Sequence, residues 1–412
     1  MPRMKKHRLL TLASVLILLT APHLLAHLDP SGWRVVDVSS QNVITGELAR
    51  FAIDGDPETQ WHTRWHDTRE TEPVKPPHSI TIDFRAVHSV AAIRYRARAH
   101  GEGGLPREYS LELSLEGRQW EKAANGLFTF RSSMSPHAVI ELETPVEARF
   151  LRLTVLSLQP SERPPEPGLV MSEIDVATPD SPLTPTTLLP VPQSREWNYD
   201  GYNWVKRHRD LLAYSEEHPS QLVFIGDSIN HRWGAPPFDE TPRTGQSVWE
   251  HYYGHRNALC LGYGWDRVEN MLWRLQHGEL SDTNPRLVVL MAGTNNFEVN
   301  SPEEIVAGVA AICDEIHRQK PAATVLLLAI FPRGASGTFP ELQEANQRLS
   351  QLGERKYIIF KDIGPAFLSE QGALTKEVMP DLLHPNAEGY RRWARAIEED
   401  VARILGDSPV GE

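Results

Sequence analysis

The sequence predicts two folded domains, a β-sandwich followed by an α/β domain in which helices cover a parallel sheet. Residues 33–177 contain short runs that alternate apolar and polar side chains, a pattern typical of strands with one buried face. After residue 197, wholly apolar runs alternate with helical stretches, which indicates strands buried on both faces and crossover helices. The 412 residues are enough for two separate cores.

Composition and charge narrow the class of protein. Hydrophobic residues make up 40% of the chain and charged residues 23%, which is an ordinary globular balance. The formal net charge of −12 leaves no general attraction for polyanions, so we expect no nucleic-acid partner. Two cysteines, Cys260 and Cys313, are too few for a disulfide framework, and we predict that both are buried thiols.

The N-terminus has the pattern of a secretory signal peptide. Basic residues precede an apolar run at residues 9–19, and a small residue, Ala26, follows soon after it. We therefore predict a signal peptide over residues 1–26 and a secreted or periplasmic protein without a membrane partner after cleavage. The alternative is an uncleaved anchor, but Pro22 and His23 interrupt the apolar run short of the ~20 residues that a spanning helix needs.

The first domain is predicted to consist of short strands without a long helix. Its alternating runs lie at residues 79–84, 90–95, 109–115, 138–142 and 150–155. Residues 178–196 then form a proline-rich linker. We expect this linker to be a semi-rigid, extended spacer without packed structure.

The second domain, residues 197–412, is predicted to alternate strands and helices. The apolar runs lie at residues 222–225, 287–291 and 325–330, and the helical stretches lie near residues 200–216, 266–277, 302–319, 340–352 and 386–405. Open α/β sheets bind their ligands beyond the carboxyl ends of the strands. Polar residues that directly follow an apolar run are therefore candidates for catalysis.

A serine and an Asp–His pair are the first candidates. Ser228 comes directly after the first apolar run, and Gly226 allows a tight turn that would point its hydroxyl into the crevice. Asp381 and His384 lie three residues apart before the last helical stretch. The carboxylate can orient the imidazole, which can then accept the serine proton. The alternatives are that Ser228 only caps a helix and that His384, one of 17 histidines, lies on the surface.

Asn295 and Asp227 are two further polar residues that follow apolar runs. Asn295 follows the second apolar run, so its side-chain amide can donate a hydrogen bond to a developing oxyanion. Taken alone, its segment is an ordinary strand-closing turn. Asp227, directly before the serine, is interpreted as a structural residue that hydrogen-bonds within its turn.

Four segments occur in an order that resembles the sequence blocks of the GDSL/SGNH esterase superfamily. They are Gly226-Asp-Ser228, Gly262-Tyr-Gly264, Gly293-Thr-Asn295 and Asp381-Leu-Leu-His384. Residues 261–280 are also similar to the catalytic subunits of platelet-activating-factor acetylhydrolase and their bacterial relatives. The resemblance implies a three-layer, flavodoxin-like α/β/α fold and ester hydrolysis through an acyl-serine, without a cofactor for catalysis. It assigns Ser228 as nucleophile, His384 as base and Asp381 as the acid that orients the base.

The resemblance also implies three oxyanion donors: the N–H of Ser228, the side chain of Asn295 and one N–H of the second block. Relatives usually have a glycine immediately before the acidic residue of that block, where this chain has Trp265. The backbone N–H survives this change, provided that the turn can be held without a positive φ at Trp265, and Gly264 is the alternative donor. An indole at the mouth of the site would narrow it or offer an apolar platform to a sugar ring.

The first domain resembles discoidin domains, also called coagulation factor V/VIII type C domains. Residues 52–65 are similar to the opening of such a domain, and looser motifs follow in the expected order up to residue 176. The resemblance implies an eight-stranded, jelly-roll-like sandwich over residues 33–177. Bacterial members that are linked to enzymes commonly bind carbohydrate, so a glycan ligand is implied here.

The same resemblance implies binding residues in this domain. Many members hold a structural calcium ion, and oxygen ligands would come from Asp54, Asp56, Thr59 and Glu173. The alternative is an acidic turn without metal. Sugar contacts by stacking and hydrogen bonding are expected from Trp65, Arg94 and Arg96.

Together these features predict an exported serine esterase that removes a short acyl group, expected to be acetyl, from an acylated polysaccharide or oligosaccharide. The sandwich would hold the enzyme on its glycan and so raise the local substrate concentration. One alternative is a lipid or lysophospholipid acyl-hydrolase, although no long apolar lid is visible in the sequence. Another is a glycan-binding adhesion protein with an inert esterase domain, although all four blocks keep their reactive residues.

Overall fold

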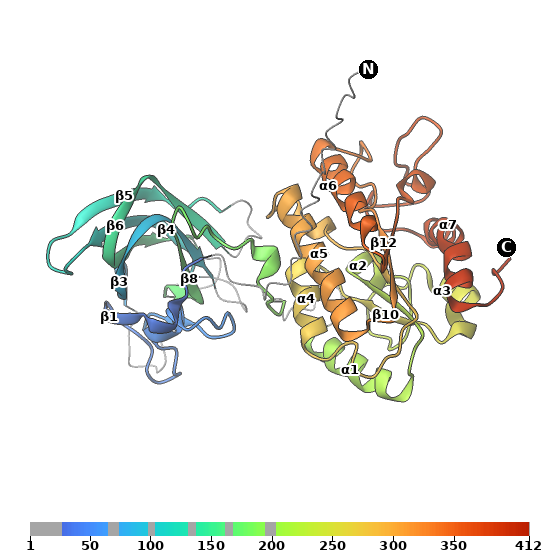
Figure 1. Ribbon diagram of the computed structural model, residues 1–412, viewed down its shortest axis with the longest axis horizontal. Coiled ribbons are helices and arrows are strands. Elements are labelled where there is room, and N and C mark those ends of the chain that lie inside the picture. The colour runs from blue at the N-terminus through green and yellow to red at the C-terminus, as the bar shows by residue number, and fades with distance from the viewer. Residues whose placement is uncertain are drawn as a thin grey trace, which may run out of the picture.

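The computed structural model describes residues 27–64, 74–97, 104–130, 137–160, 168–193 and 203–411. They form a β-sandwich and an α/β domain that lie side by side (Figure 1). The predicted signal peptide lies outside the described residues. Within these ranges, no helix combines the length and the apolar character that crossing a membrane requires.

The sandwich is built around one antiparallel sheet. Its strands are β1 (Arg34–Val38), β3 (His78–Arg96), β4 (Pro106–Ser114), β5 (Glu121–Leu127), β6 (His137–Leu158) and β8 (Glu173–Ala177). They lie in the order β1-β3-β6-β4-β5, and β8 also pairs with β3. A separate two-stranded sheet joins β2 (Trp61–His62) to β7 (Val170–Met171). The predicted sandwich is confirmed.

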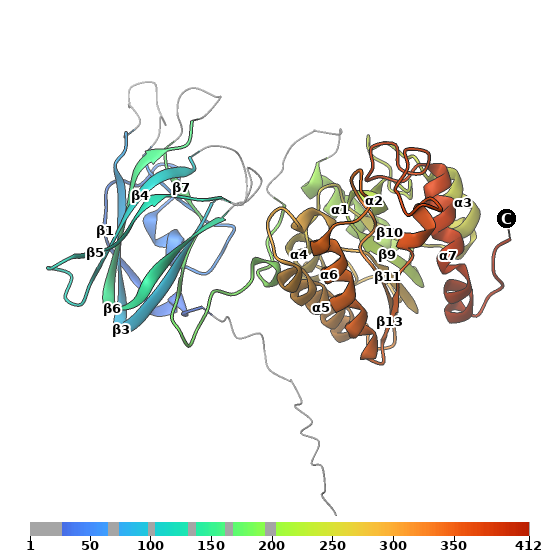
Figure 2. The same ribbon diagram turned by 90° about the horizontal axis from the view of Figure 1, so that it is seen from above.

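The two longest strands, β3 and β6, each span two of the predicted strands. β3 and β6 pair along most of their length, but their register shifts between Asp83 and His88, where Arg85 has a φ of 69°. β1 pairs with the first half of β3 and β8 with the second half, so the long strand has different neighbours on the two sides of this irregularity. Figure 2 shows β3 and β6 lying side by side in the sandwich. A bulge interrupts the alternation of side chains. The sequence therefore shows two short runs where the backbone forms one strand.

The segment between the domains is packed, which contradicts the prediction of an unpacked spacer. Residues 178–193, here called the interdomain strap, contain the short 3-10 helix Thr186–Leu188. They run onto the face of the α/β domain formed by α4 (Val268–Gln276) and α5 (Pro302–Gln319) (Figure 1). Thr187 is fully buried, and its hydroxyl donates to the carbonyl of Glu304 at 2.6 Å. On the sandwich side, Arg94 donates to the carbonyl of Thr184 at 2.6 Å. The prolines extend the strap, and the threonines between them anchor it.

The second domain contains a five-stranded parallel sheet. Its strands are β9 (Leu222–Gly226), β10 (Leu259–Gly262), β11 (Leu287–Leu290), β12 (Thr324–Leu328) and β13 (Ile358–Lys361). They lie in the order β10-β9-β11-β12-β13. All four pairings between neighbouring strands are parallel. β13 was not predicted, because it is an edge strand whose residues are mostly half-buried and gives no wholly apolar run.

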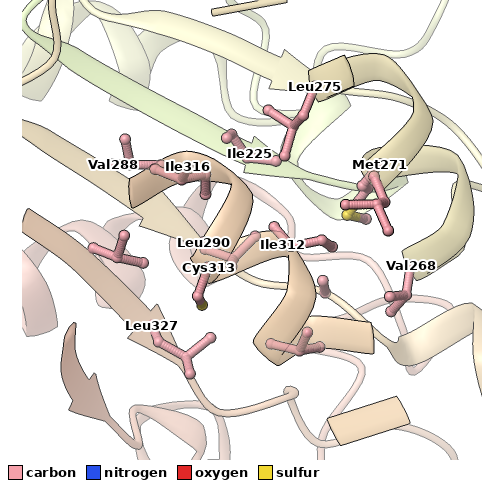
Figure 3. Close-up of a cluster of buried hydrophobic side chains, with 14 of the residues drawn as sticks. Ile225, Val268, Met271, Leu275, Val288, Leu290, Ile312, Cys313, Ile316 and Leu327 are labelled. Carbon is pink, nitrogen blue, oxygen red and sulfur yellow. The ribbon is translucent and has the colours of Figure 1, made fainter. Parts of the chain in front are cut away.

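Helices cover both faces of this sheet and complete the three-layer fold. The side chains of α1 (Trp204–Glu217), α4 (Val268–Gln276), α5 (Pro302–Gln319) and α6 (Pro340–Ser350) pack on one face. Those of α3 (Gln246–Tyr253) and α7 (Ala387–Leu405) pack on the other. Figure 3 shows the first of these clusters, in which Met271 and Ile312 from the helices lie close to Ile225 and Leu290 from the strands. Both cysteines are buried free thiols, as predicted.

One glycine of α5 sets how closely the strap approaches. A Cβ atom at Gly308 would lie 2.4 Å from the Val268 side chain and 2.6 Å from Cβ of Thr187. We expect Gly308→Ala to lower the melting temperature, because overpacking of ~1–3 kcal/mol exceeds the ~1 kcal/mol gained in helix propensity. Thermal unfolding would measure the change. The control is Gly254→Ala, where a new Cβ meets nothing within 4 Å, and a Gly308→Ala protein as stable as this control would contradict the close packing.

Candidate active site

The turn after β9 presents Ser228 at the carboxyl edge of the sheet. β9 ends at Gly226, and Ser228 is the first residue of the short helix α2 (Ser228–His231). A Cβ atom at Gly226 would lie 2.1 Å from Oδ1 of Asn230, so glycine is needed for this close approach. The helix is capped by Asp227, whose Oδ1 accepts from the N–H of Ile229 at 2.8 Å. Ser228 is therefore not the capping residue, and its hydroxyl is available for chemistry.

Asp227 is fully buried beside the nucleophile. Burial raises the pKa of its carboxyl to about 7. Its hydrogen bond to Ile229 agrees with the interpretation of Asp227 as a structural residue of the turn.

The structure brings Ser228, His384 and Asp381 into one hydrogen-bonded chain. Oγ of Ser228 lies 2.9 Å from Nε2 of His384, and Nδ1 of His384 lies 2.6 Å from Oδ2 of Asp381. In this arrangement Asp381 accepts from Nδ1–H and leaves Nε2 to accept the serine proton. The side chain of His384 is 13% exposed, whereas that of Asp381 is 49% exposed.

The Asp381 carboxylate is held by its own loop. Oδ1 accepts from the backbone N–H groups of His384 at 2.7 Å and Leu383 at 3.1 Å, and Nη1 of Arg232 lies 3.8 Å from Oδ2. Partial burial alone would raise the pKa of Asp381, but the hydrogen bonds from His384 outweigh it and lower the pKa below its ordinary value. The carboxylate thus stays ionised and fixes the tautomer of the imidazole.

Asn295 lies in the 3-10 helix Thr294–Asn296, which follows β11. Its Nδ2 donates to the backbone carbonyl of Asp266 at 2.9 Å. One N–H of the amide is thereby directed by the second sequence block, and the other is the one that can donate to a substrate oxygen. Gly293, just before the helix, has a φ of 116°, which a residue with a side chain would adopt only with strain.

The turn of the second block does not meet that condition, because it has a positive φ. Trp265 has a φ of 64°, and its side chain remains 43% exposed. The left-handed region costs a non-glycine residue ~1–2 kcal/mol. This cost explains why GDSL/SGNH sequences usually have glycine at this position. Gly264 lies before this residue and is buried. The backbone therefore keeps the glycine-like conformation although the side chain is large.

Sequence reasoning missed the residues that support this turn. The buried carboxylate of Asp266 accepts from Nε1 of Trp204 at 2.6 Å and from Nε of Arg274 at 2.8 Å. Gln193 of the strap donates to the same carboxylate at 3.1 Å and to the carbonyl of Gly264 at 3.0 Å. Burial raises the pKa of Asp266, and the guanidinium of Arg274 opposes that rise. In the sequence only the acidic residue after Trp265 stands out, since Trp204 and Gln193 lie 62 and 73 residues away from it along the chain.

The acidic loop of the sandwich brings oxygen atoms together. The Thr59 hydroxyl donates to Asp54 at 2.9 Å, and the N–H of Asp56 donates to Asp54 at 3.0 Å. Glu173 is 2% exposed, and its Oε1 has no hydrogen-bond partner among the described residues. Burial, together with the nearby Asp175 and Asp54 carboxyls, raises the pKa of Glu173 to about 9. A buried oxygen without a partner beside a second carboxylate fits a hard cation, although no group of three or more His, Cys, Asp or Glu side chains within the described ranges forms a metal cluster.

The predicted sugar contacts have different outcomes. Trp65 lies outside the described residues. Arg94 does not fit the prediction, because it is 3% exposed and forms a 2.6 Å ion pair with Asp175 inside the sandwich. Arg96 lies 3.9 Å from Asp175 and lines a cavity between the sandwich, the strap and α4, to which Arg267 also contributes.

Comparison with known proteins identifies both domains. Residues 224–392 match the GDSL-like Lipase/Acylhydrolase family, and residues 36–166 match the F5/8 type C domain. The chain is 30% identical over 207 residues to platelet-activating factor acetylhydrolase IB subunit alpha1 of Pongo abelii, covering 49% of this chain and 84% of that protein. It is 26% identical over 224 residues to the alpha2 subunit of Rattus norvegicus, covering 53% and 92%.

One solved structure illustrates the likeness of the sandwich. It is CpGH89CBM32-5 of Clostridium perfringens in complex with GalNAc-β-1,3-galactose, with a TM-score of 0.30, 22% identity, and coverage of 36% of this chain and 98% of that one. The chain belongs to the GDSL-like lipase/acylhydrolase family and carries an N-terminal F5/8 type C domain. Both resemblances seen in the sequence are thereby confirmed, and the enzyme class is that of an esterase.

We expect Ser228→Ala to abolish ester hydrolysis, because removing a serine nucleophile lowers kcat by ~10³–10⁶-fold. Turnover of p-nitrophenyl acetate and covalent labelling by a fluorophosphonate would be measured on the same samples. The exposed serine Ser281 offers a matched control, and Ser281→Ala should behave as the wild type. Labelling that persists in Ser228→Ala would show that another residue is the nucleophile.

Proposed function

We propose that the protein is an exported serine esterase that hydrolyses short-chain acyl esters, principally acetyl esters, of a polysaccharide or oligosaccharide. The observation that carries the esterase chemistry is the chain from Ser228 Oγ through His384 to Asp381, with links of 2.9 and 2.6 Å. Export is proposed from the basic and apolar pattern of residues 1–26.

The arrangement supports a two-step reaction. Ser228 Oγ attacks the ester carbonyl carbon while Nε2 of His384 takes the serine proton, and His384 then returns this proton to the departing sugar oxygen. A water molecule, deprotonated by the same nitrogen, then attacks the acyl-serine; the bond to Oγ breaks, His384 returns the proton to Ser228 Oγ, and the acid is released. In both steps negative charge develops on the former carbonyl oxygen, where the Asn295 amide and the N–H groups of Ser228 and the Trp265 turn would stabilise it.

Two features support a sugar ester as the substrate. The indole of Trp265 is 43% exposed and belongs to the turn that offers an oxyanion donor, so it can provide an apolar platform for a sugar ring. The F5/8 type C domain is held against the esterase domain by the strap, and a glycan bound there would be kept near the active site.

A lipid ester is the second candidate. The relatives named platelet-activating factor acetylhydrolase act, by their names, on a lipid from which acetyl is removed. The acetyl group is common to both candidates, so the choice between them concerns only the alcohol part of the ester.

We expect kcat/KM to fall from p-nitrophenyl acetate to p-nitrophenyl octanoate, and acetylated xylo-oligosaccharide to be a better substrate than an acetylated phospholipid. The short-chain preference follows from the proposed acetyl substrate, and the oligosaccharide preference follows from the proposed sugar platform at Trp265. Initial rates on both series would test the proposal. The reverse order in both would favour the lipid candidate.

The variant Trp265→Gly separates the platform from the chemistry. Glycine adopts the positive φ without strain and keeps the backbone N–H. The variant should therefore retain p-nitrophenyl acetate hydrolysis while KM for the acetylated oligosaccharide rises. An unchanged KM for the oligosaccharide would argue against the sugar platform.

We also propose a structural calcium ion held by Asp54, Asp56, Thr59 and Glu173. When bound, the ion would neutralise the buried Glu173 carboxylate and stabilise the sandwich without taking part in catalysis. The support is the Glu173 carboxylate oxygen, which is buried without a hydrogen-bond partner among the described residues.

We expect a calcium chelator to lower the melting temperature of the sandwich and added Ca²⁺ to restore it, because a ligand present at ~100 times its Kd stabilises the folded state by ~2.7 kcal/mol. Calorimetry would record both unfolding transitions. Glu173→Gln should abolish the response to calcium, whereas Asp37→Asn, at an exposed acid of β1, should keep it. A melting temperature that is the same with and without the chelator would rule out the bound calcium ion.

A further inference from the structure

The strap reaches the catalytic machinery through one residue. Gln193 is 7% exposed, and its side-chain amide donates to the carbonyl of Gly264 at 3.0 Å and to Oδ1 of Asp266 at 3.1 Å. These two acceptors lie directly before and directly after Trp265. The amide therefore bridges the turn at the residue whose backbone is strained.

The geometry of this turn controls two candidate oxyanion donors. One is the backbone N–H of the turn itself. The other is the amide of Asn295, whose direction depends on its hydrogen bond to the carbonyl of Asp266. Trp265 holds a φ of 64°, which an L-residue keeps only where the surroundings enforce it. A shift of this turn would therefore move both donors away from the reacting oxygen.

The strap is itself held at several points before it reaches the turn. The side chain of Asn270 donates to the carbonyl of Val191 at 3.0 Å, and Thr187 is anchored to Glu304. At the other end, Thr184 accepts from Arg94, which is paired with Asp175 of β8. Hydrogen bonds thus connect the interior of the sandwich, the strap and the second block.

We propose that Gln193 is a positioning residue for the oxyanion donors. The strap then contributes to catalysis as well as connecting the two domains. The inference rests on the proposed ester hydrolysis. Gln193 touches no reacting atom. It acts by holding Gly264 and Asp266 so that Trp265 keeps its left-handed backbone and Asn295 keeps its direction.

The test compares two strap variants of the full chain. Gln193→Met keeps the side-chain length and removes both hydrogen bonds, whereas Thr187→Val removes one strap hydrogen bond that does not involve the turn. Loss of an oxyanion donor lowers kcat by ~10²–10³-fold, and a donor that is displaced but not lost should cost less. We therefore expect kcat for p-nitrophenyl acetate to fall about tenfold in Gln193→Met, with KM within about twofold of the wild type, and Thr187→Val to keep its kcat.

Gln193→Asn gives a second variant if Gln193→Met does not fold. It keeps the amide but shortens its reach, so kcat should fall while the melting temperature stays near that of Thr187→Val. A wild-type kcat in both Gln193 variants would overturn the proposal. So would an equal fall of kcat in Thr187→Val, because general loosening of the strap would then be the cause.

The same assay separates this inference from the proposed substrate. If the wild type hydrolyses p-nitrophenyl acetate but not acetylated oligosaccharide, the sugar substrate is wrong and the comparison of Gln193 with Thr187 remains valid. If the wild type hydrolyses no ester, the proposed function itself fails.

Discussion

The buried carboxylate of Asp266 is the interaction on which the rest of the site depends. A carboxylate removed from water needs hydrogen-bond donors or an opposite charge, since its desolvation is otherwise prohibitive. Here the donors come from Trp204 at the start of α1, Arg274 in α4 and Gln193 in the strap. These three elements must converge beneath the second block before the carboxylate is satisfied. The fold of the α/β domain and the docking of the strap are therefore linked at this point.

The catalytic chain depends on a simpler arrangement. β9 and β11 are neighbours in the sheet, so the turns that carry Ser228 and Asn295 emerge beside each other at the same edge. His384 comes from the loop before α7 and brings its own partner, because Asp381 is fixed by the backbone N–H groups of that loop. A pair that orients itself locally needs only one long-range contact, from His384 to Ser228, to complete the chain.

The parts of the site that could be predicted are those encoded by short patterns. Ser228 directly follows an apolar run, and Asp381 and His384 lie three residues apart, so their roles are visible without the fold. The prediction that Arg94 contacts sugar could not be avoided from the sequence. An arginine on an alternating strand is expected to be exposed, and nothing near it in the sequence shows that its guanidinium will donate to the carbonyl of Thr184 in the strap. In the same way, the register shift in β3 interrupts the alternation of side chains, so the sequence predicts two strands where the structure has one.

Gln193 could not be predicted for a related reason. Its acceptors, Gly264 and Asp266, lie 71 and 73 residues further along the chain, and its neighbourhood has the composition of an unpacked linker. Five prolines favour an extended chain, but extension does not prevent packing. Whether an extended segment docks depends on the polar groups between its prolines and on a surface that matches them, such as the one beside Gly308.

The conformation of Trp265 connects these observations. Glycine would occupy this turn without strain, whereas tryptophan costs ~1–2 kcal/mol in the left-handed region, and its side chain remains 43% exposed. The strain has to be balanced by contacts that hold the backbone on either side. Gln193 binds the carbonyl before Trp265, and the buried network of Asp266 holds the residue after it. A chain that presents a large aromatic group at this turn therefore depends more on its strap than a relative with glycine would, and the added domain and the unusual residue are best understood together.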